Sequence, residues 1–551
     1  MSAAPPYDVI VVGSGASGAP LAARLSEDPE CRVLLLEAGQ DFRRTEDFPF
    51  EIRYSGAIGA ALPGHPNNWT FMGQLTPNLR YPIPRGKVIG GSTALNGTGF
   101  QRPRRSDFER WVAAGNDAWS YDAVLPYMVR LERDLDYGAE EIHGDAGPMP
   151  VSRNLELVHP ITTAFFEACA ELGFPEEPDK NGEQPLGYGA MPRNAVDGLR
   201  CNTAITYLND IRHRQNLTIR ANTTATRVVF DGTVATGVAV GRGSEVIAGR
   251  EVVLCAGALQ TPQLLMLSGI GAREELDEHG IAVVAEVPGV GKNLMDHPDV
   301  EVTWRSQRKL AAKTQRDSFQ GVLNFSSEGS PYVGDMEIIP LIKPAAALLA
   351  AREESGLRAA VKMVRRLPEL ARSLRGVNLK RMRQQFLTRN DFFVVAALNQ
   401  EEARGRVALA SADPKVLPRI EFNYLDNESD RRRLREVVRT ATSILRSRAF
   451  EPLLDRLTEL TDPVLGDDDR LDRWIAGHLA PTFHAACSCR MGPESDPEAV
   501  VDQRGRVRGV SNLRVADISI CPTIPTVGPA YAGVVIGERM ADFIREDQEA
   551  R

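Results

Sequence analysis

Residues 7–39 read YDVIVVGSGASGAPLAARLSEDPECRVLLLEAG. An apolar run at residues 9–12 leads into Gly13-x-Gly15-x-x-Gly18, a helical pattern follows, and a second apolar run at residues 33–36 ends on Glu37. This order of strand, glycine-rich turn, helix, strand and acid predicts a βαβ unit that binds a dinucleotide.

Each of these residues has its own physical task in such a unit. Gly13 allows the tight turn, Gly15 lets the backbone approach a pyrophosphate, and Gly18 lets the helix pack closely on the strand. Ser17 belongs to the same turn, where free N–H groups and the positive end of the helix dipole favour phosphate. Glu37 is placed to accept hydrogen bonds from a ribose diol. At this point the dinucleotide is either NAD or FAD.

The bulk properties limit the remaining possibilities. A chain of 551 residues is too long for one core, so we expect two domains. A net charge of −8 argues against a general nucleic-acid binder. The first strand starts too early to leave room for a signal peptide, and no run of about 18 apolar residues could span a membrane. We therefore expect a cytoplasmic protein.

The cysteines indicate neither a disulfide framework nor a metal site. Seven cysteines are scattered along the chain, an odd number that suits reduced thiols. Cys487-x-Cys489 has no second Cys/His pair at zinc-finger spacing, so we expect no metal.

Three further stretches stand out beyond the βαβ unit. Residues 40–80 lack periodicity and predict a long covering loop. Residues 85–97, RGKVIGGSTALNG, are so rich in glycine and small polar residues that this backbone must lie close against something flat or charged. Residues 251–257 predict a strand, and Thr261-Pro262 is expected to begin a helix that ends near Ser268-Gly269.

With the ending Leu513-Arg-Val-Ala-Asp517 and Pro522-Thr-Ile-Pro525, these segments resemble the glucose-methanol-choline (GMC) oxidoreductase family over nearly the whole chain. The resemblance implies FAD and an α/β fold, α+β overall. A Rossmann-like FAD-binding domain is expected at residues 1–160, 200–300 and 481–551. A substrate domain built on an antiparallel sheet with helices is expected at residues 161–199 and 301–480.

The resemblance also implies roles for individual residues at the cofactor. Val228 would lie against the adenine, and Asp517 would reach the ribityl or phosphate region of FAD. Four residues would lie against the isoalloxazine ring, namely Gly90, Ser92, Asn96 and Gly97. Members that bind flavin covalently carry a histidine where this chain has Leu95, so we expect FAD to be bound non-covalently.

Alcohol oxidation by a flavin needs a hydride acceptor, a base for the hydroxyl proton and a group that holds the oxygen. Of the eight histidines, His484 in FHAACSCRMG (residues 483–492) occupies the position of the family's catalytic histidine. The family's second catalytic residue, a histidine or asparagine, is replaced by Ala530. The hydroxyl of the adjacent Tyr531 could substitute for it. His297 is expected to be a structural hydrogen-bonding residue.

These features predict an FAD-dependent oxidoreductase that converts an alcohol to an aldehyde or ketone by hydride transfer to flavin N5. His484 would be the base, and electrons would pass to O2 or another acceptor. Because Ala530 can neither orient an oxygen nor share a proton, two alternatives stay open. One is a non-oxidative flavoenzyme of the same fold, similar to a lyase or a fatty-acid photodecarboxylase. The other is a flavin-binding protein without catalysis.

Residues 345–385 depart from the family pattern. Between Arg352 and Arg383 there are ten Lys and Arg residues against three Glu, with apolar residues at helical spacing. This pattern predicts an amphipathic helical insertion. It could contact an anionic membrane surface or an acidic partner, or cover the substrate entrance, and a helical hairpin with a solvated basic face fits equally well.

Overall fold

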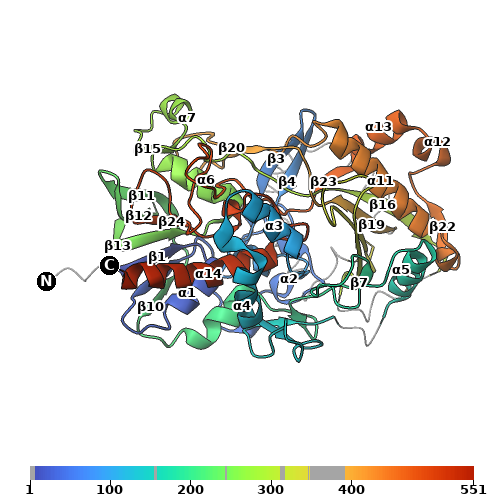
Figure 1. Cartoon of the computed structure of the whole chain (residues 1–551), viewed down its shortest axis with the longest axis horizontal. Coiled ribbons are helices and arrows are strands. Elements are labelled where there is room, and N and C mark those ends of the chain that lie inside the picture. The colour runs from blue at the N-terminus through green and yellow to red at the C-terminus, as the bar shows by residue number, and fades with distance from the viewer. Residues whose placement is uncertain are drawn as a thin grey trace, which may run out of the picture.

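In the computed structural model, a parallel sheet built on the βαβ unit lies on one side of the molecule (Figure 1). The structure describes residues 7–550 apart from 154–157, 242, 244, 309, 311–316, 345–346 and 348–390. The basic insertion predicted at residues 345–385 therefore lies almost entirely outside the described residues.

The parallel sheet confirms the predicted strands at its centre. Its parallel strands are, in spatial order, β10 (Leu217–Arg220), β2 (Val33–Leu36), β1 (Tyr7–Val12), β13 (Glu245–Leu254) and β24 (Leu513–Val515). The long strand β13 also pairs antiparallel with a β-meander made of β11 (Ala225–Asp231) and β12 (Val234–Val240). The carboxyl ends of β1 and β2 therefore lie side by side, where open α/β sheets bind ligands.

Helices α1 (Gly18–Leu25) and α14 (Ala530–Glu549) pack against each other along this sheet (Figure 1). Their contact is close because α14 has a glycine where it meets the turn before α1. A Cβ on Gly537 would lie 2.2 Å from the carbonyl oxygen of Ser17, and the Ser17 hydroxyl donates to the Gly533 carbonyl at 2.6 Å. The last helix of the chain is thus fixed to the glycine-rich turn at residues 13–18.

Helix α6 (Gly257–Leu267) begins four residues before the predicted start at Thr261. The Asp517 carboxylate accepts a hydrogen bond from the Gly257 N–H at 2.8 Å and another from the Thr261 hydroxyl at 2.6 Å. A side chain 260 residues away thus supplies the cap of this helix.

An antiparallel sheet lies on the other side of the molecule (Figure 1). Its strands are β7 (Tyr188–Ala190), β16 (Pro298–Ser306), β17 (Gly321–Phe325), β18 (Met336–Pro340), β19 (Phe392–Leu398), β22 (Leu454–Leu457) and β23 (Leu479–Pro481). Helices α5 (Pro160–Glu171) and α11 (Glu428–Leu445) pack on this sheet, and α13 (Asp468–His478) packs on α11 (Figure 1).

The prediction of a loop over residues 40–80 is wrong at its end. Strands β3 (Phe71–Thr76) and β4 (Leu79–Ile83) form a hairpin there, and Gly73 of β3 pairs with Ile420 of β21 (Arg419–Glu421). Strand β20 (Arg406–Ala408) completes this four-stranded sheet. The pairing partner lies far along the chain, so the local sequence does not signal it.

Shorter elements connect these layers. They are α2 (Phe50–Arg53), α3 (Arg105–Ala113), α4 (Tyr121–Leu131), α7 (Arg273–Glu278), α12 (Asp462–Leu465), β5 (Glu132–Asp134), β6 (Met149–Val151), β8 (Ala195–Val196), β9 (Leu199–Arg200), β14 (Ile270–Gly271) and β15 (Ala285–Glu286). Among the described residues, no helix has both the length and the apolar character needed to cross a bilayer.

Candidate active site

A cavity of about 530 Å³ lies between the parallel sheet and the antiparallel sheet. One side is lined by the carboxyl ends of β1 and β2, and the other by β16, β18 and β19. The cavity is within the size range of small-molecule and cofactor sites. Eight of the sequence-predicted cofactor residues line it, namely Gly13, Gly15, Ser17, Glu37, Ser92, Asn96, Gly97 and Asp517.

Two glycine-rich loops form the floor of this cavity with bare backbone. Gly13 has a φ of +104°, and a Cβ there would lie 2.5 Å from the carbonyl oxygen of Cys255. Gly91 has a φ of +53°, and its Cβ would lie 2.7 Å from Cα of Gly15. The loops at residues 13–18 and 86–97 are therefore in direct contact, and side chains on them would fill the space in which a ligand's phosphates could approach the backbone.

Two carboxylates, Glu37 and Asp517, line the cavity on the side of the parallel sheet. Glu37 accepts hydrogen bonds from the Ser14 hydroxyl at 2.6 Å and from the Gly39 N–H at 2.7 Å. Burial raises the pKa of both Glu37 and Asp517, although the hydrogen bonds that they accept act in the opposite direction. This arrangement fits a dinucleotide such as FAD. It has bare backbone at the start of α1, the buried acid Glu37 after β2, and the start of α6 capped by Asp517.

Three predicted cofactor residues do not line the cavity. A Cβ on Gly18 would lie 1.9 Å from the Gly13 carbonyl oxygen, and one on Gly90 would lie 2.9 Å from the amide oxygen of Asn202, so both glycines serve close packing. Val228 is buried, and its N–H donates to the Ser268 hydroxyl at 2.8 Å. The cavity wall in this region is formed instead by residues 223–225.

His484 lines the other end of the cavity, in the loop after β23. Its Nδ1 lies 2.9 Å from Nδ1 of His297, and Nε2 of His297 lies 3.0 Å from the carbonyl oxygen of Pro525. A carbonyl can only accept, so His297 carries its proton on Nε2 and presents an unprotonated Nδ1. His484 must then donate from Nδ1. Its Nε2 is left as an unprotonated proton acceptor.

The electrostatic surroundings keep both histidines neutral. Burial lowers the pKa of His297 to about 3. Burial, then the neighbouring His297 and then the positive charge of Arg85 hold the pKa of His484 well below its ordinary value. The Asp296 carboxylate accepts from the backbone N–H groups of His484 at 2.6 Å and of His297 at 2.9 Å, which fixes the two rings relative to each other.

Ala530 is the first residue of α14 and lines the cavity with its methyl group. Tyr531 is fully buried and does not line the cavity. Its hydroxyl accepts from Nε of Arg102 at 3.0 Å and lies 3.3 Å from Oε1 of Glu132. The structure therefore brings Ala530 to the site and directs the hydroxyl of Tyr531 into a different part of the protein.

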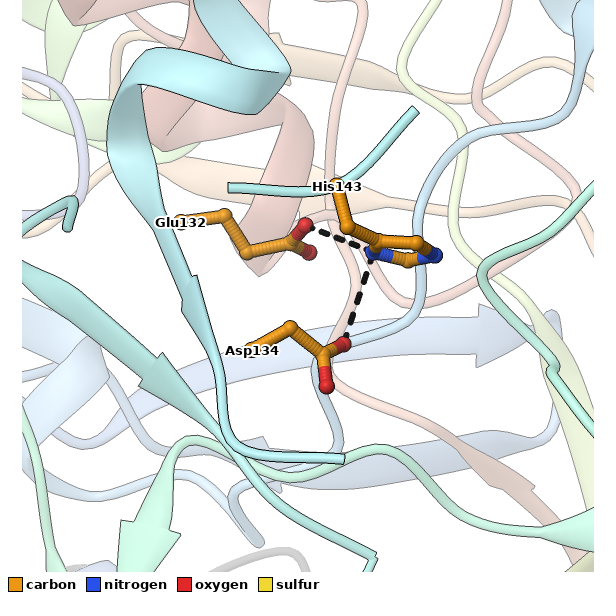
Figure 2. A group of neighbouring side chains, drawn as sticks. All are labelled: Glu132, Asp134 and His143. Atoms are coloured by element: carbon orange, nitrogen blue, oxygen red, sulfur yellow. Dashed lines mark hydrogen bonds and ion pairs between the residues drawn. The ribbon is translucent and has the colours of Figure 1, made fainter. Parts of the chain in front are cut away.

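That part contains a buried cluster of Glu132, Asp134 and His143 with the geometry of a possible metal site (Figure 2). His143 Nδ1 lies 2.9 Å from the Glu132 carboxylate and 3.5 Å from that of Asp134, and Nε2 lies 2.9 Å from Asp179. Burial acts to lower the pKa of His143, but hydrogen bonds to Asp179 and Glu132 outweigh it and raise this pKa to about 9.

Two arginines complete the charge balance of this cluster. Arg102 pairs with Glu132 at 2.6 Å, and Arg153 pairs with Asp134 at 2.7 Å and with Asp179 at 2.5 Å. Three buried carboxylates are thus matched by two guanidinium groups and one imidazolium, and the exposed Asp136 also pairs with Arg153 at 3.3 Å. The cluster is a closed salt-bridge network, and its side chains already have partners in the positions that a metal ion would take.

Sequence reasoning missed four residues at the reaction end. Three of them are Arg85, Asp296 and Glu337. The fourth is His297 in its role of setting the tautomer of His484, since it was expected only as a structural residue. Only the run that ends in Asp296-His297-Pro298 after the glycines at 289 and 291 offered a signal, because it is a second glycine-rich crossing. Nothing in the local sequence indicates that His297 meets a histidine 187 residues later.

Comparisons with known proteins agree with this geometry. The sequence models of the GMC oxidoreductase family match residues 7–299 and 401–537. A GMC-type oxidoreductase of Rhodococcus erythropolis is 36% identical over 98% of this chain and 99% of its own length. The oxygen-dependent choline dehydrogenase of Vibrio vulnificus is 33% identical over 98% of this chain and 95% of its own. The solved structure of pyridoxine 4-oxidase from Mesorbium loti superposes with a TM-score of 0.84 at 27% identity, covering 98% of this chain and 99% of that one.

Proposed function

The chain belongs to the GMC oxidoreductase family, and from this premise we propose that it oxidises the alcohol group of a small molecule to an aldehyde or ketone, with His484 as the base. Like its relatives it is an FAD-dependent oxidoreductase. When bound, FAD supplies the acceptor for the hydride. The choline dehydrogenase and pyridoxine oxidase relatives support an alcohol as the substrate group.

The single observation that carries the proposal is the free Nε2 of His484. The Pro525 carbonyl fixes the tautomer of His297, and His297 fixes that of His484, so one nitrogen facing the cavity can take the hydroxyl proton. The imidazolium formed at His484 keeps its Nδ1–H bond to His297. The low pKa of His484 keeps the base unprotonated before the substrate arrives.

Ala530 makes the proposed site simpler than one with a second polar side chain. A methyl group cannot hold the substrate oxygen, so His484 both receives the proton and orients the hydroxyl. The same observation favours a second candidate, a non-oxidative reaction on this fold, in which product forms while the flavin stays oxidised.

Anaerobic mixing of the FAD-loaded protein with a panel of alcohols tests the proposal. We expect an alcohol to bleach the flavin band, and we expect His484→Ala and His484→Gln to slow bleaching by about 10²- to 10⁴-fold. The matched control is His213→Ala, which removes an exposed histidine remote from the cavity. Bleaching at the wild-type rate in His484→Ala would overturn the role of His484, and product without bleaching would support the non-oxidative candidate.

Two finer features belong to the same proposal. Because Leu95 offers no nucleophilic nitrogen, FAD is bound non-covalently, and acid precipitation should release all of the flavin into the supernatant. The reduced flavin passes its electrons to O2 or to another acceptor. Comparing reoxidation rates in air and with a redox dye distinguishes the two.

A further inference from the structure

A second cavity, of about 420 Å³, lies at the start of helix α3. Its walls come from residues 102–106 and residues 180–186, two segments that are far apart in the sequence. It shares no lining residue with the cavity at His484. Its volume is within the range of sites that bind small molecules, so it is a separate candidate for a binding site.

The wall of this second cavity is rich in cations. The charged residues that line it are Arg102, Arg104, Arg105, Lys180, Glu109 and Glu183. Glu183 pairs with Arg105 at 2.7 Å, and Glu109 is exposed. In the buried part of the wall, the single carboxylate of Glu177 serves both Arg104 and Lys180. Glu337 acts on Lys180 only through its field.

The backbone at residues 101–104 directs two arginines to this side. Pro103 favours an extended conformation for the residue before it, and Arg104 is itself extended, with φ −76° and ψ 159°. Alternate side chains of an extended segment point to opposite sides. Gln101 accordingly lines the cavity at His484, whereas Arg102 and Arg104 line the second cavity. One short segment thus separates the two cavities.

Arg102 has one guanidinium nitrogen without a partner. The residue is 3% exposed, its Nε donates to the Tyr531 hydroxyl at 3.0 Å, and its Nη2 donates to Glu132 at 2.6 Å. Nη1 is also buried, but it has no hydrogen-bond partner among the described residues. A buried donor without an acceptor destabilises the folded state, so this nitrogen favours a ligand that accepts hydrogen bonds.

Arg104 and Ser106 add further donors of the same kind. Nη1 of Arg104 pairs with Glu177 at 2.9 Å, while its Nε and Nη2 have no partner in the described parts of the chain. Nε lies beside the cavity wall, since a Cβ on Gly334 would lie 3.7 Å from it and 3.3 Å from Cδ2 of the lining residue Leu186. The Ser106 hydroxyl, in the first turn of α3, is likewise buried without a partner there. This turn also presents the positive end of the helix dipole.

We propose that the second cavity binds a phosphate group, carried either by free phosphate or by a small phosphate ester, through Arg102, Arg104 and Ser106. Three guanidinium nitrogens and one hydroxyl match the three terminal oxygens of a phosphate group better than the two oxygens of a carboxylate. Pro185, Leu186 and Val333 line the same cavity and offer apolar surface to the organic part of an ester. The site is independent of the reaction proposed at His484.

Calorimetry on the FAD-loaded protein, in a phosphate-free buffer of low ionic strength, tests the site. Inorganic phosphate and glycerol 3-phosphate are titrated separately, with glycerol as the neutral control and acetate as the carboxylate control. Bound FAD keeps these ligands from the glycine-rich loops of the other cavity. We expect at least one phosphate ligand to bind more tightly than acetate and to raise the melting temperature. The tighter of the two phosphate ligands identifies the source of the phosphate group.

Two variants connect the binding to the named donors. Ser106→Ala removes a hydroxyl and no charge, and we expect the Kd for the phosphate ligand to rise about fivefold. Arg104→Gln removes two donors and the charge, and we expect a rise of about tenfold or more. Arg419→Gln removes an exposed arginine of β21 outside this cavity and should leave the Kd unchanged. Without ligand, Ser106→Ala should melt no lower than the wild type, because its hydroxyl makes no hydrogen bond to the described residues.

The outcomes decide the inference without any turnover. If neither phosphate ligand gives heat or raises the melting temperature of the wild type, the inference is wrong. An equal Kd in the wild type, Ser106→Ala and Arg104→Gln would also overturn it, and acetate binding as tightly as phosphate would overturn the phosphate class. Failure of every alcohol to bleach the flavin would contradict the proposed function alone.

Discussion

Two histidine sites in this molecule hold their protons in opposite ways. At the cavity, His484 and His297 meet each other and a carbonyl, and burial lowers the pKa of both. In the salt-bridge network, His143 lies between Glu132 and Asp179, and its pKa is raised to about 9. Figure 2 shows its contacts with Glu132 and Asp134. The same side chain is therefore neutral in one place and a structural cation in the other.

The difference shows that burial alone does not decide the charge of a histidine. Both sites are removed from water, which disfavours the imidazolium. The groups in contact with the ring decide its charge. Carboxylates in direct contact stabilise the imidazolium enough to offset the loss of hydration, and a neutral imidazole does not. A site for proton transfer and a site for structural cohesion can thus be distinguished by the atoms within about 3 Å of the ring.

The largest expected effect comes from removing the tautomer control at the cavity. His297→Leu leaves Nδ1 of His484 without its acceptor, so we expect anaerobic flavin reduction to slow by about 10²- to 10³-fold. His297→Asn retains an acceptor atom near the position of Nδ1 and should recover much of this loss. Unchanged flavin reduction in His297→Leu would show that His484 does not depend on its partner.

In the salt-bridge network, the expected effect is on stability instead of rate. His143→Gln leaves three carboxylates with two arginines, and we expect the free energy of unfolding to fall by about 3 kcal/mol. Chemical denaturation measures this loss, with His213→Gln as the exposed control. A large loss of turnover in a folded His143→Gln protein would contradict the separation of the two sites.

The two sites should also differ in their response to pH. Folding raises the pKa of His143 from its ordinary value of about 6.5 to about 9, so its stabilisation is complete below pH 6.5 and is lost as the pH rises through 9. Denaturation curves between pH 6 and 10 should therefore show a decline in stability that is smaller in His143→Gln. An equal decline in both proteins would contradict the assignment.

The smallest expected effect concerns the backbone next to His484. Cys487 has a φ of +70°, a left-handed backbone conformation in which a side chain is strained. Cys487→Gly relieves about 1 kcal/mol of strain and loses a similar amount of buried surface, so we expect a net change within about 1 kcal/mol. Cys489→Gly, at a buried position without a positive φ, should cost about 2 kcal/mol by the same denaturation measurement.

The sequence was informative where function depends on residues close together in the chain. The turn at Gly13 and Gly15, the strand β2 and Glu37 lie within one segment of 33 residues, and their spacing alone predicts their arrangement. Ser92, Asn96 and Asp517 were assigned by resemblance, and all three line the cavity. The start of α6 was placed wrongly because its cap, Asp517, comes from a strand end far along the chain.

The end of the cavity near His484 depends on contacts between distant segments of the chain. Its arrangement was therefore only partly predictable from the sequence. His484 and Ala530 were identified by position, but neither the partner of His484 nor the direction of the Tyr531 side chain follows from local pattern. His297 was expected to be structural, and its bond to His484 gives that expectation a specific place in the proposed chemistry. Glu337 lies in an ordinary strand, and only the sheet register brings it to the cavity.

Helix α14 has a consequence for engineering the site. Ala530 borders the cavity, Tyr531 holds the arginine of the salt-bridge network, and the Gly533 carbonyl accepts the Ser17 hydroxyl. Three neighbouring positions thus serve three different parts of the molecule. A saturation library that restores a second polar group should vary position 530 alone, since simultaneous changes at 531 or 533 would alter stability and cofactor affinity and hide any gain in turnover.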